Sequence, residues 1–271
     1  MRKMKFWKLS GAGNDFVLLT GGELAGERLK GLARSLCARK LSVGADGLLY
    51  VNRAGSGVIS VRYFNSDGSE AFCGNGSRCA ALWASLRGLV SGRFTLRTLA
   101  GDLEARVLSR NRVEMSMPDV GTVSLRHPGK YPSGISGVHF LNTGVPHAVV
   151  PVRSAAAADV ERLGRLLRHN PAFGRPGANV NFAEVRNGGL IVRTYERGVE
   201  GETLACGTGI TASAVALVLD GKVKPPVKVT ARSGERFLVG LKARSGGASG
   251  IRVSGPAALI FEGSLTAVRY A

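Results

Sequence analysis

The sequence predicts an α+β protein of two pseudo-symmetric lobes, each a curved β-sheet or barrel wrapped around a central helix. Two observations lead to this prediction. Short runs of alternating apolar residues follow one another along the chain, whereas helical patterns are few, which is typical of α+β rather than alternating βαβ folds. One stretch of sequence also recurs about half a chain later. A length of 271 residues, 44% of them hydrophobic, provides for a core in each half.

The individual elements follow from apolar periodicity. Strands are predicted at residues 5–9, 16–19, 57–64, 94–98, 103–108, 112–117, 138–142, 148–151, 180–185, 190–196, 227–231, 236–241, 251–258 and 258–261. Helices are predicted at residues 22–40, 74–89, 156–168 and 207–220. Residues 117–119 are the best candidate linker, and residues 244–250 are expected to form a flexible hairpin loop. We therefore place the N-terminal lobe at 1–118, completed by a C-terminal strand at 259–271, and the C-terminal lobe at 119–258.

Composition and charge exclude several classes of protein. The net charge is +18, but the 27 arginines and 10 lysines are scattered without a dense basic run, so we expect no specific nucleic-acid binding. The weakly polar stretch 204–219 is too short to span a membrane, and the basic N-terminus lacks the apolar core of a signal peptide. We therefore expect a cytoplasmic protein without membrane association, whose four cysteines are free thiols. Of these, Cys37 and Cys79 are expected to lie in the core.

The internal repeat joins residues 59–84 to residues 191–217. Each stretch has an apolar strand with an arginine, then a tyrosine and a polar turn containing glycine and glutamate. Each continues into Cys-Gly-(Asn/Thr)-Gly and an apolar helix, which places Cys73 and Cys206 at the two helix N-termini. This pattern indicates a duplicated fold in which each half presents one cysteine.

A cysteine at a helix N-terminus lies among free backbone N–H groups and at the positive end of the helix dipole. These groups favour the thiolate, so we expect a lowered pKa for both sulfurs. The same turns can bind a carboxylate. Two acid–base groups of one kind can remove a proton from one face of a carbon and return one to the other face. The sequence has no lysine-centred pyridoxal motif that could stabilise the carbanion, so the interpretation is an amino-acid epimerase that works through its two cysteines.

Seven segments carry a family resemblance: residues 11–16 (GAGNDF), 44–47 (GADG), 64–70 (FNSDGSE), 73–78 (CGNGSR), 142–147 (NTGVPH), 177–181 (GANVN) and 195–209 (YERGVEGETLACGTG). With these segments in the family's order, the chain resembles the diaminopimelate epimerases nearly from end to end. The resemblance implies reversible conversion of LL- to meso-diaminopimelate, a step toward lysine and peptidoglycan, without a metal or an organic cofactor. It also implies two lobes closing over the substrate, and a homodimer.

The resemblance also implies roles for individual residues. Cys73 and Cys206 would be the base and the acid, with His147 and Glu196 close to the reacting centre. Substrate-binding roles carry over to Asn14, Asn65, Gly74, Asn75, Asn179, Glu196, Arg197, Gly207 and Thr208. The turns 74–75 and 207–208 would hold the α-carboxylate through backbone N–H groups. Asp46 and Asp67 are expected to build turns rather than to contact the substrate.

Three departures from the family pattern concern the substrate's distal end. Many family members carry Gln where Gly47 stands and Asn where Val145 stands, and the family usually has one more residue before its first cysteine than residues 70–72 provide. Two side-chain contacts to the substrate are therefore missing or supplied by other residues. A racemase of another amino acid, such as proline, on the same scaffold is the alternative within enzymes. A basic binding protein with idle cysteines and a dithiol redox protein are the alternatives from other classes.

Overall fold

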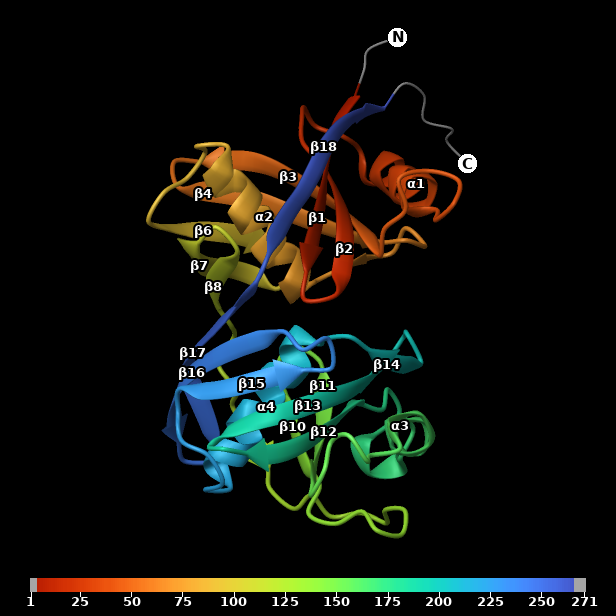
Figure 1. The fold of residues 1–271 in the computed structure, drawn as a ribbon, viewed down its shortest axis with the longest axis vertical. Coiled ribbons are helices and arrows are strands. Elements are labelled where there is room, and N and C mark those ends of the chain that lie inside the picture. The colour runs from red at the N-terminus through yellow and green to blue at the C-terminus, as the bar shows by residue number, and fades with distance from the viewer. Residues whose placement is uncertain (1–3, 266–271) are drawn as a thin grey trace. The chain divides into compact units, whose positions relative to one another are not determined.

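The structure, a computed structural model, describes residues 4–265, which form two compact units (Figure 1). One unit contains residues up to 115 together with the chain from 255 onward, and the other contains residues 116–254. The predicted boundary after residue 118 falls close to this division. Residues 266–271 of the predicted C-terminal strand lie outside the described residues.

The first unit holds the N-terminal elements and the last described strand. Its strands are β1 (Met4–Gly11), β2 (Asn14–Leu19), β3 (Gly47–Gly55), β4 (Val58–Asn65), β5 (Glu70–Ala71), β6 (Arg93–Thr98), β7 (Gly101–Ser109), β8 (Arg112–Ser116) and β18 (Ala258–Leu265), and its helices are α1 (Gly26–Cys37) and α2 (Gly74–Leu86). Strand β1 pairs antiparallel with β2 and β18, β2 runs parallel to β3, and β3 pairs antiparallel with β4. Strand β4 pairs antiparallel with β5 and parallel with β6, and an antiparallel series β6-β7-β8 completes the curved sheet.

The second unit holds the central part of the chain. Its strands are β9 (Val123–Ser124), β10 (His139–Asn142), β11 (Pro146–Val152), β12 (Asn179–Arg186), β13 (Gly189–Glu196), β14 (Gly201–Thr203), β15 (Val227–Ala231), β16 (Arg236–Arg244) and β17 (Gly247–Pro256); its helices are α3 (Val160–Arg168), the 3-10 turn Pro171–Phe173 and α4 (Gly207–Leu219). Strand β10 pairs antiparallel with β9 and β11, β11 runs parallel to β12, and β12 pairs antiparallel with β13. Strand β13 pairs antiparallel with β14 and parallel with β15, followed by the antiparallel series β15-β16-β17.

The two units therefore repeat one succession of pairings, which confirms the predicted duplication. The parallel pair β2–β3 places Phe16 opposite Gly47, and the parallel pair β11–β12 places His147 opposite Asn179. Because both units use the same order of strands, Phe16 corresponds to His147 and Gly47 corresponds to Asn179. The α+β fold class predicted from the sequence is confirmed.

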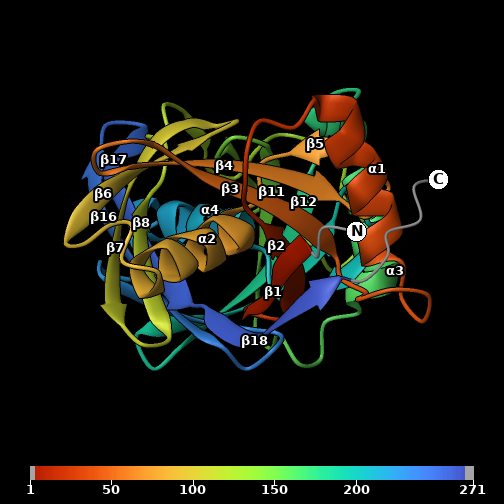
Figure 2. The ribbon, with the colours of Figure 1, turned by 90° about the horizontal axis from the view of Figure 1, so that it is seen from above.

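Each unit encloses one helix. In α2 the residues from Asn75 to Ala84 are all buried, and Figure 2 shows this helix lying inside the curve of the strands of its unit. Helix α4 is buried from Gly209 to Leu217 in the second unit. Both helices are rich in Gly, Ala, Ser and Thr, whose small side chains let strands approach from all sides, and neither has a polar face that would suit the surface.

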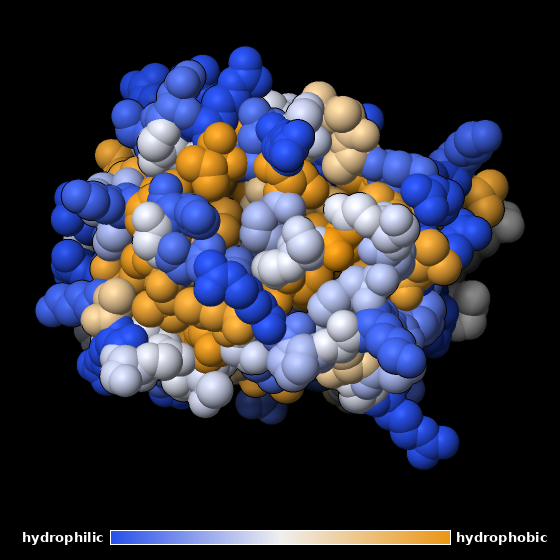
Figure 3. Space-filling view, turned by 90° about the horizontal axis from the view of Figure 1, so that it is seen from below, coloured by the Kyte–Doolittle hydropathy of each residue, from blue (hydrophilic) through white to orange (hydrophobic). Residues whose placement is uncertain are grey.

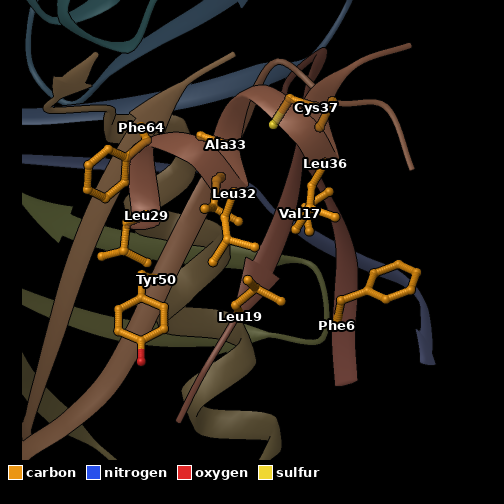
Figure 4. Close-up of a cluster of buried hydrophobic side chains, with 12 residues drawn as sticks. Phe6, Val17, Leu19, Leu29, Leu32, Ala33, Leu36, Cys37, Tyr50 and Phe64 are labelled. Atoms are coloured by element: carbon orange, nitrogen blue, oxygen red, sulfur yellow. The ribbon is translucent and has the colours of Figure 1, made fainter. Parts of the chain in front are cut away.

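The outer helix α1 covers one side of the sheet in the first unit. Its apolar residues lie on a single face, and Leu29, Leu32 and Leu36 are fully or almost fully buried. Figure 4 shows these side chains pointing toward β2, where Val17 lies, and toward the aromatic rings of β3 and β4. The opposite face of α1 carries the charged residues, which is the pattern of an amphipathic helix on a sheet.

The local structure differs from the prediction at β3 and at the turn between β16 and β17. Strand β3 was not predicted, because Gly47 to Val51 are all buried and show a continuous apolar run instead of alternation. The hairpin predicted at residues 244–250 is present, but its connection is a two-residue turn: β16 ends at Arg244, β17 begins at Gly247, and these two residues pair with each other. Gly246 takes the positive φ of 71° that this turn requires.

Polar and apolar residues are mixed on the surface. On the face shown in Figure 3, hydrophilic side chains are interspersed with hydrophobic ones. Among the described residues, no helix has both the length and the apolar character needed to cross a membrane.

Candidate active site

Cys73 is the N-cap residue of α2. Its backbone is extended, with φ −132° and ψ 109°, and its sulfur accepts a hydrogen bond from the backbone N–H of Gly76 at 3.3 Å. The thiol therefore occupies the place that a serine or aspartate side chain usually takes at a helix start. Cys73 is partly exposed, so its sulfur lies both at the helix N-terminus and within reach of solvent.

Cys206 has the same position in the second unit. It is the N-cap of α4 with φ −111° and ψ 110°, and its sulfur accepts from the backbone N–H of Gly209 at 3.4 Å. A further contact of 3.3 Å joins the sulfur to the Thr208 hydroxyl. The predicted placement of both cysteines at helix N-termini is thus confirmed. Their roles in catalysis stay a prediction.

The expected lowering of the pKa is wrong for Cys206. Burial raises the pKa of this thiol, and the negative charge of Glu196 raises it further. Hydrogen bonds from Thr208 and from the Gly209 N–H oppose both effects but do not overcome them. A helix N-terminus lowers a thiol pKa only where it outweighs the cost of removing the thiolate from water, and at Cys206 it does not.

Glu196 is the acidic neighbour of this thiol. It ends β13, and its Oε1 accepts a hydrogen bond from the Thr203 hydroxyl at 2.5 Å. Burial raises the pKa of the Glu196 carboxyl, while hydrogen bonds from Thr203 and from the Cys206 thiol lower it in part. Glu196 and Cys206 therefore form one acid–base pair, in which the charge on each group depends on the proton of the other.

Asn179 and Arg197 meet beside this pair. The Asn179 Oδ1 accepts a hydrogen bond from the backbone N–H of Arg197 at 2.7 Å, and Asn179 is buried at the start of β12. The Asn179 side chain is therefore held in one orientation, which is the condition for a binding residue that does not have to reorganise.

In the first unit, Asn14 and Asn75 contact each other. The Asn75 Nδ2 donates to the Asn14 Oδ1 at 2.7 Å, and the Asn14 Nδ2 donates to Asp46 Oδ2 at 3.0 Å. The Asn75 Oδ1 in turn accepts a hydrogen bond from the guanidinium of Arg78, which is almost completely buried. The chain of contacts links the loop before β3 to the first turns of α2, and Asp46 orients Asn14 in addition to shaping its loop.

Asn65 lies at the turn that follows β4. Its Nδ2 donates to the Ser69 hydroxyl at 2.9 Å, and Asp67 Oδ1 accepts from the backbone N–H of Ser69 at 2.7 Å. The turn role expected for Asp67 is confirmed. Asn65 pairs with Gly47 across β3 and β4, so this turn lies next to the position of the first family departure.

Gly47 is required by its surroundings. A Cβ atom at this position would collide with the ring of Tyr63, and would lie 2.7 Å from the Tyr63 hydroxyl and 2.6 Å from the Phe64 carbonyl oxygen. The space that a longer side chain would need at position 47 is therefore filled by Tyr63, whose ring packs edge-on against Phe16 at 5.9 Å between centroids.

His147 is buried on β11. Its Nδ1 lies 3.1 Å from the side-chain nitrogen of Asn181, and within residues 4–265 its Nε2 is a buried atom with no hydrogen-bond partner. Burial lowers the pKa of His147 to about 3, assisted by the positive charge of Arg197, so the ring is neutral at physiological pH. Asn181 and its partner Thr194 were not singled out from the sequence, although Asn181 closes the quoted segment 177–181.

The predicted residues thus divide between the two units. Cys73, Gly74, Asn75, Asn14 and Asn65 belong to the first unit, and the remaining predicted residues belong to the second: His147, Asn179, Glu196, Arg197, Cys206, Gly207 and Thr208. Gly74 and Gly207 are the first residues of α2 and α4. Within the described chain, no group of three or more His, Cys, Asp or Glu side chains is placed to hold a metal ion.

Solved structures with similar folds define the class. A PhzF-family phenazine biosynthesis protein from Bacillus anthracis matches with a TM-score of 0.75 at 16% identity, covering 98% of this chain and 100% of that one. A probable proline racemase from Agrobacterium radiobacter matches with a TM-score of 0.71 at 17% identity, over 97% of this chain and 93% of that one. The protein is thus a duplicated α+β protein of this fold, with one helix-capping cysteine in each unit.

Comparison at the level of sequence is more specific. The family model described as diaminopimelate epimerase matches residues 6–123 and 139–244. The diaminopimelate epimerase of Aquifex aeolicus is 40% identical over 282 aligned residues, 97% of this chain and 98% of that protein, and that of Archaeoglobus fulgidus is 40% identical over 86% of this chain and 88% of that protein. The chain belongs to the diaminopimelate epimerase family and is an isomerase of the epimerase type.

Proposed function

We propose that this enzyme interconverts LL- and meso-2,6-diaminopimelate by a two-cysteine mechanism, on the route to lysine and peptidoglycan precursors. The observation that carries the proposal is the equivalent placement of Cys73 and Cys206 as N-caps of the enclosed helices in two duplicated units. An isomerase that inverts one carbon needs one acid–base group for each face, and the duplication provides two of the same kind. The names of the relatives supply the substrate.

In the proposed reaction Cys73 begins as the thiolate and Cys206 as the thiol. The Cα–H bond of the substrate breaks, its proton passes to the Cys73 sulfur, and the electron pair stays on the α-carbon. The Cys206 S–H then gives its proton to the opposite face, which leaves Cys206 as the thiolate. The raised pKa of Cys206 beside Glu196 supports this starting state, because it keeps Cys206 protonated. The reverse reaction uses the same two sulfurs with exchanged roles.

Binding groups near each cysteine would carry the charge that develops. We propose that backbone N–H groups at Gly74–Asn75 and Gly207–Thr208 bind the α-carboxylate and stabilise the carbanion; their position in the first turns of α2 and α4 supports this role. We propose that Asn14, Asn65 and Asn179 bind the distal amino-acid end, and that Glu196 and Arg197 meet polar groups of the substrate. No step needs a cofactor or metal. We further expect a cytoplasmic homodimer that binds neither nucleic acid nor membranes.

One observation favours the alternative substrate class, an amino acid other than diaminopimelate. Tyr63 fills the space beside Gly47, so the distal end of the site is built differently from the family pattern. If this change shortens the site, a smaller amino acid such as proline or glutamate would be the substrate, and the cysteine chemistry would stay the same.

The test uses the reduced protein with LL-diaminopimelate in D₂O. NMR should show loss of the α-proton signal together with appearance of the meso isomer. Cys73→Ala and Cys206→Ala should each lower the rate by about 100-fold or more, since each removes one acid–base group. Cys37→Ala is the matched control, because Cys37 is a buried core thiol in the first unit and its pKa is raised by burial to about 12.

The outcomes separate the candidate functions. Exchange at the α-carbon of proline, hydroxyproline, glutamate or histidine, without exchange in diaminopimelate, would keep the mechanism and replace the substrate. Full activity in either cysteine variant would remove that residue from the mechanism. Activity that rises on oxidation would favour a dithiol redox protein. No exchange in any of these amino acids and slow reaction of all four thiols with iodoacetamide would favour a binding protein.

A further inference from the structure

The orientation of the Asn181 side chain is fixed by its buried surroundings. Its Nδ2 donates to the carbonyl oxygen of Ala148 at 3.1 Å, and its Oδ1 accepts from the Thr194 hydroxyl at 3.0 Å. Rotating the amide by 180° would place its oxygen against the Ala148 carbonyl, two acceptors without a proton between them. Asn181 and Thr194 are both buried, so water does not offer a substitute partner.

This orientation determines the proton position on His147. The second N–H of the Asn181 amide faces the His147 Nδ1 at 3.1 Å, so Nδ1 accepts a hydrogen bond and carries no proton. In a neutral imidazole the proton then lies on Nε2. The Nε2–H group is buried and has no partner within the described chain, so the protein leaves the hydrogen-bonding capacity of this donor unused.

The duplicated fold contains its own comparison. By strand register, His147 and Asn181 of the second unit correspond to Phe16 and Leu49 of the first. A Cβ on Gly76 would contact Leu49 at 2.9 Å and Phe16 at 3.4 Å, whereas a Cβ on Gly209 would collide with Asn181. An apolar pair therefore suffices to pack against the enclosed helix in one unit, and packing alone does not explain the polar pair in the other.

We propose that Asn181 is a positioning residue that holds His147 as the Nε2–H tautomer, so that the ring donates at Nε2 and does not act there as a base. The tautomer follows from geometry alone. Its consequence for catalysis depends on the function proposed above: a neutral N–H donor stabilises a negative charge on the substrate or on a thiolate without giving up its own proton. Inverting the tautomer would present a lone pair to that charge.

The tautomer can be read directly by NMR of protein carrying ¹⁵N-labelled histidine. His147→Phe identifies the His147 signals among the four histidines. In the wild type we expect an unprotonated Nδ1 and a protonated Nε2. Asn181→Asp should reverse the pattern or protonate both nitrogens, because a carboxylate accepts a hydrogen bond and so favours a protonated Nδ1 facing it. A protonated Nδ1 in the wild type would overturn the proposal, whatever the variants do.

Two further variants separate positioning from simple packing. Asn181→Leu introduces the residue found at the corresponding place in the first unit and removes the donor to Nδ1. Thr194→Val disturbs the same buried network but leaves that donor in place. We expect mixed His147 tautomers and a kcat lower by about 10- to 100-fold, with little change in KM, for Asn181→Leu only. Equal effects of both variants on tautomer and kcat would show that Asn181 only fills space.

The failure of this inference is distinguishable from failure of the proposed function. If the wild type shows the Nε2–H tautomer but does not act on diaminopimelate, the positioning role stands and the substrate is wrong. If the enzyme is active and His147 carries its proton on Nδ1, the function stands and the inference is wrong.

Discussion

Glu196 and Cys206 illustrate how one buried carboxyl group can set the protonation state of a thiol. Burial raises the pKa of both groups, and the charge of Glu196 adds to the increase at Cys206. Glu196→Gln removes that charge and should lower the Cys206 pKa, which increases the thiolate fraction at any pH below it. We therefore expect faster alkylation of Cys206 by iodoacetamide at pH 8, measured by mass spectrometry, and a lower epimerase rate.

The control for this prediction is the labelling of Cys37 in the same samples. It is a buried core thiol outside the proposed mechanism, and its slow labelling should not change in Glu196→Gln. A Cys206 that reacts as slowly in the variant as in the wild type would mean that burial alone sets its pKa.

His147 leads to a prediction about stability and pH. In the folded protein burial lowers its pKa to about 3, from a reference of 6.5 in the unfolded chain. Between these two values the unfolded chain binds a proton that the folded protein does not, so stability is full above pH 6.5 and is lost as the pH falls. By pH 4 the loss from this group is on the order of 3 kcal/mol.

His147→Phe, the residue type at the corresponding position of the first unit, should remove that part of the pH dependence. Urea unfolding at pH 7 and pH 4 would measure it as a smaller difference between the two unfolding free energies than in the wild type. His139, whose pKa is also lowered by burial, remains in both proteins and cancels in the comparison. An unchanged difference would mean that His147 is accessible to protons in the folded state.

For individual residues, the sequence predicted where side chains lie in the fold more accurately than it predicted their pKa values and hydrogen-bond partners. The Cys-Gly-x-Gly pattern placed both cysteines at helix N-termini, because the N-cap position is determined locally. It also predicted a lowered pKa at Cys206, which is wrong, because burial and the approach of Glu196 depend on the whole unit. Asn181 was missed for a similar reason: its contacts to Ala148 and Thr194 join three strands.

At the scale of elements, Gly47 and Tyr63 form a coupled pair between β3 and β4. Gly47→Ala should destabilise the protein by about 1–3 kcal/mol, because the new methyl group would collide with the Tyr63 ring and the Phe64 carbonyl oxygen. In a Tyr63→Ala background the same change should cost less, although the Phe64 carbonyl still opposes it. Urea unfolding of the four proteins of this double-mutant cycle gives the coupling energy.

Gly22→Ala is a suitable control, because a Cβ at that position of the same unit would have no neighbour within 4 Å. Additive effects of Gly47→Ala and Tyr63→Ala would contradict the coupling. In that case the glycine at position 47 would be explained by the Phe64 carbonyl alone.

Strands with a regular alternation of apolar and polar residues were predicted well, whereas strands without such a period were missed. Strand β15 was predicted with its observed bounds, because its residues alternate between buried and exposed positions. Strand β3 gave no alternation since its first five residues are all buried, and the two-residue strands β5 and β9 are too short to give a period. Helices α2 and α4 were predicted with their observed first residues, because glycines and small residues follow each cysteine.

At the scale of the whole chain, the duplication was visible in only part of the sequence. Residues 59–84 and 191–217 repeat a pattern that includes the cysteines, whereas β1–β3 and β10–β12 share no such pattern. Their common origin appears in the strand pairing, which repeats in parallel and antiparallel order. Pairing order depends on backbone geometry and tolerates replacement of Phe16 by a histidine and of Leu49 by an asparagine at corresponding positions. A comparison of the two halves by sequence alone does not detect the duplication at positions where the residue type has changed in this way.

The C-terminal strand gives the last prediction. Strand β18 pairs with β1 from Met4 to Ser10, Trp7 Nε1 donates to Glu262 Oε2 at 2.8 Å, and the rings of Phe6 and Phe261 pack edge-on. Deleting residues 258–271 would remove Phe261 and leave the hydrogen-bonding edge of β1 and the ring of Phe6 exposed, while the second unit keeps all its strands. Hydrogen exchange should show lost protection in β1 and β2 and retained protection in β12 and α4. Glu262→Ala, which removes the acceptor for Trp7 Nε1–H but keeps the strand, should retain protection everywhere. Loss of protection in both units together would show that they unfold as one cooperative body, and retained protection in β1 would show that β18 is dispensable for the first unit.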